Sequence, residues 1–179
     1  AVRYLNASPV FIDCDDFYNL DIKKTLKFIE DETYFKNGYS FNKITRKKIK
    51  ALIIVHVFGN AANVQAIIKV CRNRNIKILE DAAGALGTFY NSGRLKGKHV
   101  GTLGEVGCIS FNGNKIITAA GGGVLLTNNF KLARKAKYLS TTAIDNKLNY
   151  KHDDIGYNFR LSNVHAAIGI AQLEKINIF

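Results

Sequence analysis

The stretch Ile49-Lys-Ala-Leu-Ile-Ile-Val-His-Val-Phe58 is almost continuous in apolar and β-branched residues, a pattern typical of a strand buried on both faces. Residues 63–72 then carry apolar side chains at spacings of three and four, which predicts an amphipathic helix. A second apolar run, Ile76-Lys-Ile-Leu79, ends in Glu80-Asp81. Because the connections are short, these segments predict a parallel, right-handed βαβ unit.

The rest of the chain continues this alternation. Further strands are predicted at residues 9–13, 106–111 and 123–127, and further helices at 19–29, 131–139 and 162–173, the last with Ser162 as N-cap. Since there is no repeat, low-complexity tract or linker, we expect no internal domain boundary. The pattern predicts an α/β protein in which a layered sheet carries helices on its faces.

Composition narrows the class of protein. The chain has 179 residues, 47% of them apolar, which excludes disorder and small disulfide scaffolds. Its three cysteines are far apart and form no metal-binding cluster, so a reducing cytoplasm is expected and no metal. No apolar run approaches the ~18 residues that span a bilayer, and no signal peptide is recognisable.

The net charge of +12 permits nucleic acid, an acidic membrane or a phosphorylated ligand as partner. The densest basic segment, residues 43–50, lies between ordered-looking segments and lacks an RNA-binding pattern. A solvated connecting surface is the favoured interpretation of this segment, ahead of a nucleic-acid patch.

Chemistry in such a sheet is expected at the carboxyl ends of the strands. Asp81 lies at one such end and could pair with a cationic ligand nitrogen, while Ala82 and Ala83 leave room for a flat ring. Helix capping and metal ligation are the alternatives for a carboxylate in this place. Ser110, at the end of the strand at 106–111, could donate a hydrogen bond to a phosphate.

Lys115 is the only lysine or arginine between Lys98 and Lys131, in a turn rich in Asn and Gly before two isoleucines. A lysine desolvated by apolar neighbours can attack a carbonyl and form a Schiff base. An ordinary exposed turn lysine is the alternative, and the apolar flank favours function. The glycines 121–123 precede a strand instead of a helix, which indicates a tight turn and argues against a phosphate loop.

Five ordered motifs carry a resemblance: Val55-His-Val-Phe-Gly59, Glu80-Asp-Ala-Ala-Gly-Ala-Leu-Gly87, Ile109-Ser-Phe-Asn-Gly-Asn-Lys115, Gly121-Gly-Gly123 and Gly156-Tyr-Asn-Phe-Arg-Leu-Ser162. Together they resemble the DegT/DnrJ/StrS family of pyridoxal-phosphate-dependent sugar aminotransferases. Within it they are most similar to the branch that aminates nucleotide-linked 4-keto-6-deoxy sugars for legionaminic acid, bacillosamine or perosamine. The resemblance implies an α/β fold, as part of the large domain of a fold-type I transferase with a mixed, mostly parallel sheet and helices on both faces. It also implies a cytoplasmic enzyme of surface polysaccharide synthesis.

The resemblance also implies roles for single residues. Lys115 matches the lysine that bonds to pyridoxal 5'-phosphate and moves the proton, and Asp81 matches the aspartate that keeps the pyridine nitrogen protonated. Ser110 matches a phosphate ligand. Asn158 matches an asparagine that reaches the cofactor phosphate of the neighbouring subunit, which implies a homodimer with shared active sites; a structural turn and cap is its alternative.

Within the resemblance, a lysine at position 115 favours transamination, because members that dehydrate the sugar carry histidine there. The expected amino donor is glutamate and the acceptor is a nucleotide-linked sugar with a keto group at C4. One departure is Gly84, where family members commonly carry Gln, Glu or His near the cofactor.

The family's upstream phosphate-binding segment and small C-terminal domain have no counterpart here, and the chain has no methionine. We therefore expect residues 1–179 to be the central part of the cofactor-binding domain. Three hypotheses follow: part of a sugar aminotransferase, inactive alone; a truncated, non-catalytic remnant acting as a structural or dimerisation module; and, on charge alone, a nucleic-acid-binding domain.

Overall fold

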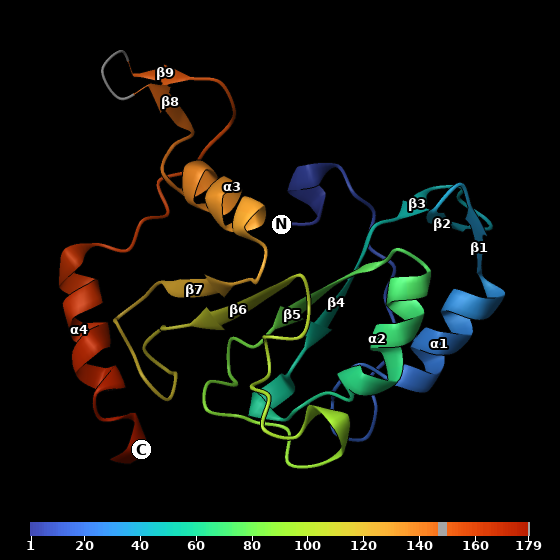
Figure 1. The fold of residues 1–179 in the computed structure, drawn as a ribbon, viewed down its shortest axis with the longest axis horizontal. Coiled ribbons are helices and arrows are strands. Elements are labelled where there is room, and N and C mark those ends of the chain that lie inside the picture. Colours follow the sequence, from blue (N-terminus) through green and yellow to red (C-terminus); the bar gives the residue numbers. More distant parts are fainter. Residues whose placement is uncertain (147–149, 179) are drawn as a thin grey trace.

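A four-stranded sheet forms the centre of the protein in the computed structural model, which describes residues 1–146 and 150–178. Its strands are β4 (Ala51–Val55), β5 (Lys77–Asp81), β6 (Val106–Ser110) and β7 (Gly123–Leu126), in that spatial order (Figure 1). The pairs β4–β5 and β5–β6 are parallel, and β7 runs antiparallel to β6. The mixed, mostly parallel sheet predicted from the sequence is confirmed.

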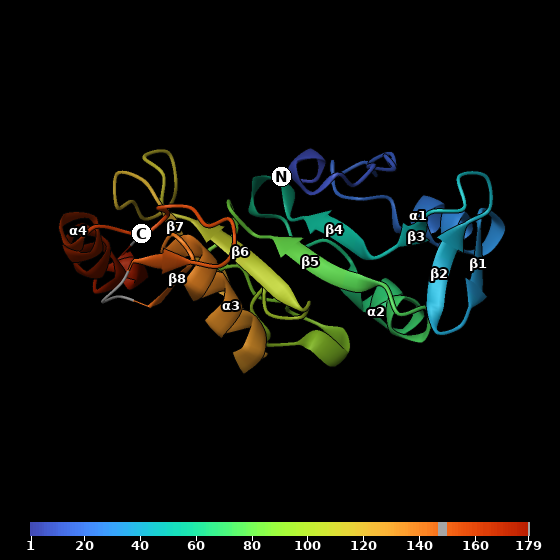
Figure 2. The same ribbon diagram turned by 90° about the horizontal axis from the view of Figure 1, so that it is seen from above.

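Helix α2 (Val64–Asn73) connects the first two parallel strands, as the apolar spacing predicted. Its apolar side chains pack against the inner residues of β4 and β5, in a core that includes Ile54, Ile67 and Ile78. Helix α3 (Phe130–Ser140) follows β7 and lies on the same side of the sheet as α2 (Figure 2).

The opposite face of β4 differs from the prediction of a strand buried on both faces. Ile53 is 47% exposed and Val55 is 41% exposed, whereas Ile54 between them is fully buried. Because side chains alternate along a strand, one face of β4 packs on the core and the other is open in the described structure. The apolar run predicted the strand correctly, but the prediction that both of its faces are buried is wrong for the described structure.

A second, three-stranded antiparallel sheet precedes β4. It consists of β1 (Thr33–Lys36), β2 (Tyr39–Asn42) and β3 (Lys48–Ile49). The β1–β2 hairpin was not predicted, although Asn37 and Gly38 both have positive φ in its two-residue turn, a strong hairpin signal. The basic segment at residues 43–50 begins after β2, includes β3 and leads into β4, so part of it pairs in this sheet.

The two ends of the chain contain one wrong prediction and two confirmed ones. Residues 9–13 form no strand, and no strand of the described structure pairs with them. Helix α1 (Ile22–Asp31) begins after Asp21, whose carboxylate accepts from the backbone N–H of Lys24. Helix α4 (Asn163–Leu173) begins after Ser162, the predicted N-cap, which accepts from the N–H of His165.

The remaining elements are short. They are the strands β8 (Ile144–Asn146) and β9 (Lys151–His152) and the 3-10 turns η1 (Arg3–Leu5), η2 (Val57–Gly59), η3 (Gly93–Leu95) and η4 (Ile176–Ile178). Over residues 1–146 and 150–178, no helix is both long enough and apolar enough to cross a membrane.

Candidate active site

A cavity of about 290 Å³ opens where the parallel strands of the central sheet end. Its walls come from the ends of β4, β5 and β6 and the segments after them. The lining residues are Phe58, Ala83, Gly84, Leu86, Ser110, Asn114, Lys115 and Ile116. This is the edge at which open α/β sheets bind their ligands, so the structure places the predicted chemistry where the topology requires it.

Lys115 lies in the turn after β6, and its half-buried side chain lines the cavity. Its backbone N–H donates to the carbonyl of Asn112 over 3.1 Å, which closes the turn. Of the two isoleucines expected to desolvate the lysine, Ile117 is fully buried and Ile116 is 51% exposed. The buried one anchors the turn in the protein, and the exposed one forms part of the cavity wall.

Ser110, the last residue of β6, lines the same cavity. Its hydroxyl oxygen accepts from the backbone N–H of Asn112 over 3.2 Å, which leaves its own hydrogen available to a ligand. The structure therefore brings together Lys115 and Ser110, the amine and the hydroxyl that the sequence singled out.

Asp81 ends β5 and is paired in register with Val55 on one side and Cys108 on the other. Paired residues share a face of a sheet, and every second residue returns to it, so Asp81 and Ser110 project from the same face. One carboxylate oxygen accepts from the backbone N–H of Ala83 over 3.0 Å. Asp81 is not one of the residues that line the cavity.

The loops after β4 and β5 touch closely beside the cavity. A Cβ on Gly59 would lie 2.9 Å from the carbonyl oxygen of Gly84, and Gly59 has φ +83°, so only glycine fits there. Phe58 has a positive φ of 53° and is 84% exposed, and its side chain lines the cavity. The N–H of Val57 donates to the buried Asn19 side chain over 2.9 Å, which fixes this loop.

Gly84 lines the cavity without a steric need for glycine. A Cβ built on it would meet its nearest neighbour, the backbone nitrogen of Gly59, at 3.8 Å, an ordinary contact. The backbone at this point therefore has room for a Cβ, and the packing does not require a glycine.

Asn158 does not line the cavity. It forms an isolated antiparallel bridge with Thr141, next to the end of α3. The N–H of Tyr157 donates to the carbonyl of Leu139, and the N–H of Phe159 donates to that of Ser140. These bonds hold the segment against the end of α3; the role of Asn158 toward a neighbouring subunit stays a prediction.

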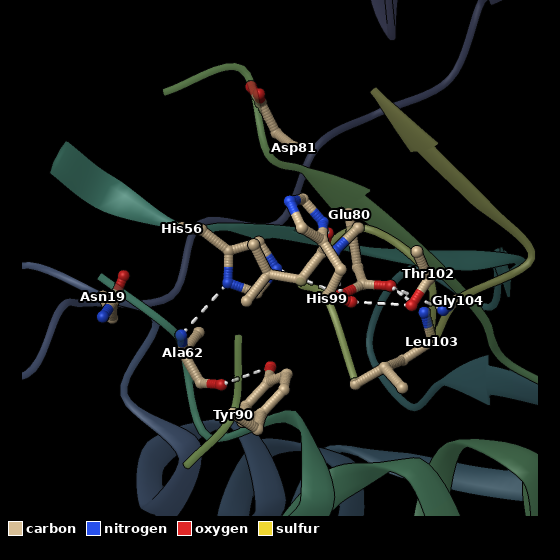
Figure 3. A network of polar contacts seen from close by, with 12 residues as sticks. Asn19, His56, Ala62, Glu80, Asp81, Tyr90, His99, Thr102, Leu103 and Gly104 are labelled. Carbon is tan, nitrogen blue, oxygen red and sulfur yellow. Dashed lines mark hydrogen bonds and ion pairs between the residues drawn. The ribbon is translucent and has the colours of Figure 1, made fainter. Parts of the chain in front are cut away.

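The buried pair formed by Glu80 and His56, below the strand end, was not predicted from the sequence (Figure 3). Burial alone would raise the pKa of Glu80, but hydrogen bonds from His56 and from the backbone N–H groups of Gly104, Gly101 and Leu103 outweigh it. The pKa of this carboxyl is therefore lowered. An acid within an apolar strand is the signal that could have revealed such a partner.

A larger hollow, of about 720 Å³, lies at the other end of the sheet, between the last turn of α2 and the first turn of α3. Lys77 and Glu105 form an ion pair of 3.2 Å at its side. It contains none of the predicted site residues and lies at the amino end of β5, so we assign the function to the smaller cavity.

The donors at the smaller cavity match the chemical groups of pyridoxal 5'-phosphate. Lys115 supplies an amine for its aldehyde, and Ser110 supplies a hydroxyl for its phosphate. Asp81, on the same sheet face as Ser110, supplies a carboxylate for a protonated ring nitrogen. The residues present therefore fit this cofactor.

Comparisons with known proteins agree with this geometry. Residues 1–179 match the model of the DegT/DnrJ/EryC1/StrS aminotransferase family over the whole chain. GDP-perosamine synthase of Escherichia coli O157:H7 is 34% identical over 179 residues, which are 100% of this chain and 44% of that protein. A Campylobacter jejuni enzyme named UDP-4-amino-4,6-dideoxy-N-acetyl-beta-L-altrosamine transaminase is 33% identical over 99% of this chain and 43% of its own length.

Among solved structures, Helicobacter pylori PseC, an aminotransferase involved in the biosynthesis of pseudoaminic acid, superposes with a TM-score of 0.81. It is 27% identical and matches 99% of this chain and 43% of its own. The chain thus spans less than half the length of the relatives it matches.

The sheet topology is that of the α/β fold of pyridoxal-phosphate-dependent aminotransferases, and Lys115 lines a cavity at the carboxyl edge of this sheet. The chain belongs to the DegT/DnrJ/EryC1/StrS aminotransferase family, whose members are pyridoxal-phosphate-dependent sugar aminotransferases. The expectations of family, fold class and cofactor are confirmed.

Proposed function

We propose that the protein transfers an amino group from glutamate to C4 of a nucleotide-linked 4-keto-6-deoxy sugar. The observation that carries the proposal is the cavity that Lys115 and Ser110 share at the carboxyl edge of the sheet. Relatives named for perosamine and altrosamine derivatives support a sugar nucleotide as substrate. We further propose that the reaction serves surface polysaccharide synthesis in the cytoplasm.

Each site residue has a role that its chemistry supports. Bound pyridoxal 5'-phosphate supplies an aldehyde and a ring that accepts electrons. The amine of Lys115 would hold the cofactor through this aldehyde and, when free, would carry a proton between the cofactor and C4 of the sugar. Asp81 keeps the ring nitrogen protonated, and Ser110 donates a hydrogen bond to the phosphate. In sum, the amino acid gives its amino group and its α-hydrogen to the keto carbon of the sugar, takes up the keto oxygen in exchange and leaves as a keto acid.

The lysine at position 115 supports transamination over dehydration, because its amine can both hold the cofactor and carry the proton. Asn158 is proposed to reach the cofactor of a second copy, so that a homodimer shares its sites. Its position in an exposed segment at the end of α3 is compatible with contact between subunits. We propose that residues 1–179 are the central part of the cofactor-binding domain.

The test uses the intact protein loaded with pyridoxal 5'-phosphate. Borohydride reduction should add the cofactor's mass to the peptide that contains Lys115, and Lys115→Arg should abolish the addition while Lys131→Arg leaves it unchanged. With nitrogen-15 glutamate and a panel of GDP- and UDP-linked 4-keto-6-deoxy sugars, one product should carry the label. No addition to Lys115 in folded protein would refute the assignment and favour the non-catalytic remnant.

A further inference from the structure

The Glu80 carboxylate is the most extensively hydrogen-bonded side chain near the site (Figure 3). The residue is only 1% exposed. Its Oε2 accepts from His56 Nε2 over 3.0 Å and from the N–H of Gly101 over 2.9 Å. Its Oε1 accepts from the N–H groups of Leu103 and Gly104, each over 2.6 Å. Each oxygen therefore has two donors and no exposure to water.

The hydrogen positions in this network are determined by the neighbouring backbone. The N–H of Ala62 donates to His56 Nδ1 over 3.1 Å, so Nδ1 must be the unprotonated nitrogen. Nε2 consequently carries the hydrogen and donates it to Glu80. The pair is a neutral imidazole that donates to a carboxylate anion, and neither ring nitrogen can exchange roles without losing a bond.

The four donors lie next to the two strands that flank β5. His56 directly follows β4, and the segment from Gly101 to Gly104 leads into β6. That segment lies directly on β6, because a Cβ on Gly107 would come within 1.8 Å of the carbonyl oxygen of Gly101. One buried carboxylate thus ties together the neighbouring ends of three strands.

Asp81 is the residue after Glu80 and projects from the opposite face of β5 (Figure 3). Its main chain is also held on both sides: its carbonyl accepts from the N–H of His56, and the N–H of Ala82 donates to Cys108, both over 2.9 Å. A rotation of the strand end that freed Glu80 would also turn Asp81 away from the face it shares with Ser110.

We infer that Glu80 and His56 are positioning residues for Asp81: by clamping the end of β5 from below, they aim its carboxylate at the ring nitrogen of the cofactor. The inference rests on the proposed function. Glu80 does not contact the cofactor, and its effect on cofactor binding passes through Asp81.

The experiment uses pyridoxamine 5'-phosphate as probe, because this form has no aldehyde and cannot bond to Lys115. Its dissociation constant is measured on the intact apoprotein by fluorescence. Glu80→Gln replaces one carboxylate oxygen, which accepts two hydrogen bonds, with an amide NH2 group that cannot accept them. We expect the affinity for pyridoxamine 5'-phosphate to fall by about tenfold. His56→Asn, which loosens only one of the four bonds, should weaken binding less.

A double-mutant cycle separates positioning from general damage. In an Asp81→Asn background, Glu80→Gln should cause no further loss of affinity, because the carboxylate that it aims is already gone. An equal loss in both backgrounds would overturn the inference. The same cycle with His56→Asn decides the question if Glu80→Gln does not fold.

Ser40→Ala is the matched control. It removes a hydrogen bond made by another fully buried side chain, from the hydroxyl of Ser40 to the carbonyl of Arg74 over 2.8 Å, away from the cavity. It should lower the unfolding temperature and leave probe affinity unchanged; an affinity loss like that of Glu80→Gln would make the effect one of stability alone and contradict positioning. Failure of unmutated protein to bind the probe would instead refute the proposed function.

Discussion

The Nε2 atom of His56 lies 3.0 Å from Oε2 of Glu80, and both side chains are completely enclosed. A buried carboxylate is costly to desolvate, and removing its partners leaves an uncompensated charge. The residue after Glu80 is Asp81, the proposed cofactor ligand. A residue that stabilises the fold and a residue proposed to bind the cofactor are therefore adjacent at the end of β5.

Acid should expose the contribution of Glu80 to stability. Because the folded state lowers the pKa of Glu80 below its ordinary value of 4.5, the stabilisation is fully present above that pH. It is lost as the pH falls through the lower, folded value. Glu80→Gln should lower the free energy of unfolding by roughly 1–3 kcal/mol at pH 7.

The measurement is urea unfolding of both proteins from pH 7 to pH 3. The difference between the two proteins in the free energy of unfolding should narrow below pH 4.5, because only the unmutated protein loses the charge of the Glu80 carboxylate. Surface carboxylates titrate equally in both proteins and cancel in the difference. A difference that stays constant over this range would show that folding does not lower the pKa of Glu80.

Gly107→Ala should destabilise the protein strongly. The new Cβ would overlap the carbonyl oxygen of Gly101 at 1.8 Å, so backbone must move, and we expect a loss of about 3 kcal/mol or more. Gly121→Ala is the control, since no atom lies within 4 Å of a Cβ there. Denaturant unfolding of the two variants checks the prediction, and equal stability would contradict the packing of this loop on β6.

Gly59→Ala should destabilise the protein, and Gly84→Gln should not, although the two glycines are neighbours. Gly59 combines positive φ with a 2.9 Å contact, and alanine should cost roughly 2 kcal/mol in unfolding experiments. A Cβ on Gly84 would lie 3.8 Å from its nearest neighbour, so Gly84→Gln should fold normally. If its amide reaches the cofactor, pyridoxamine 5'-phosphate should bind several-fold more tightly, about 1 kcal/mol; weaker binding would show that the cavity has no room for it.

Thiol labelling should report on the charge of Asp81. Cys71 is buried, and burial raises its pKa to about 11, so it should react only after unfolding. Cys14 and Cys108 are exposed, but partial burial and the neighbouring Asp81 raise the pKa of Cys108. Asp81→Asn should therefore speed labelling of Cys108 and not of Cys14, as followed by mass spectrometry with a chromogenic thiol reagent. An unchanged Cys108 rate would place the carboxylate elsewhere.

Local patterns predicted most of the elements, because each pattern arises within a few residues. The spacing in residues 63–72 predicts α2, and Ser162 predicts the start of α4, since helix periodicity and capping need only near neighbours. The failures have the same origin. Residues 9–12 are apolar and are followed by Asp13, but a strand needs a partner, and no strand of the described structure pairs with them.

The sequence by itself determined the alternation of strands and helices, the order of the family motifs and the choice of Lys115, Asp81 and Ser110 as site residues. Only the tertiary structure decided that Lys115 and Ser110 share a cavity, that Asp81 and Ser110 share a sheet face, and that Glu80 meets His56. These relations depend on strand register and on contacts between residues distant in the chain. Such contacts form when strands pair and pack, so no periodicity along the sequence contains them.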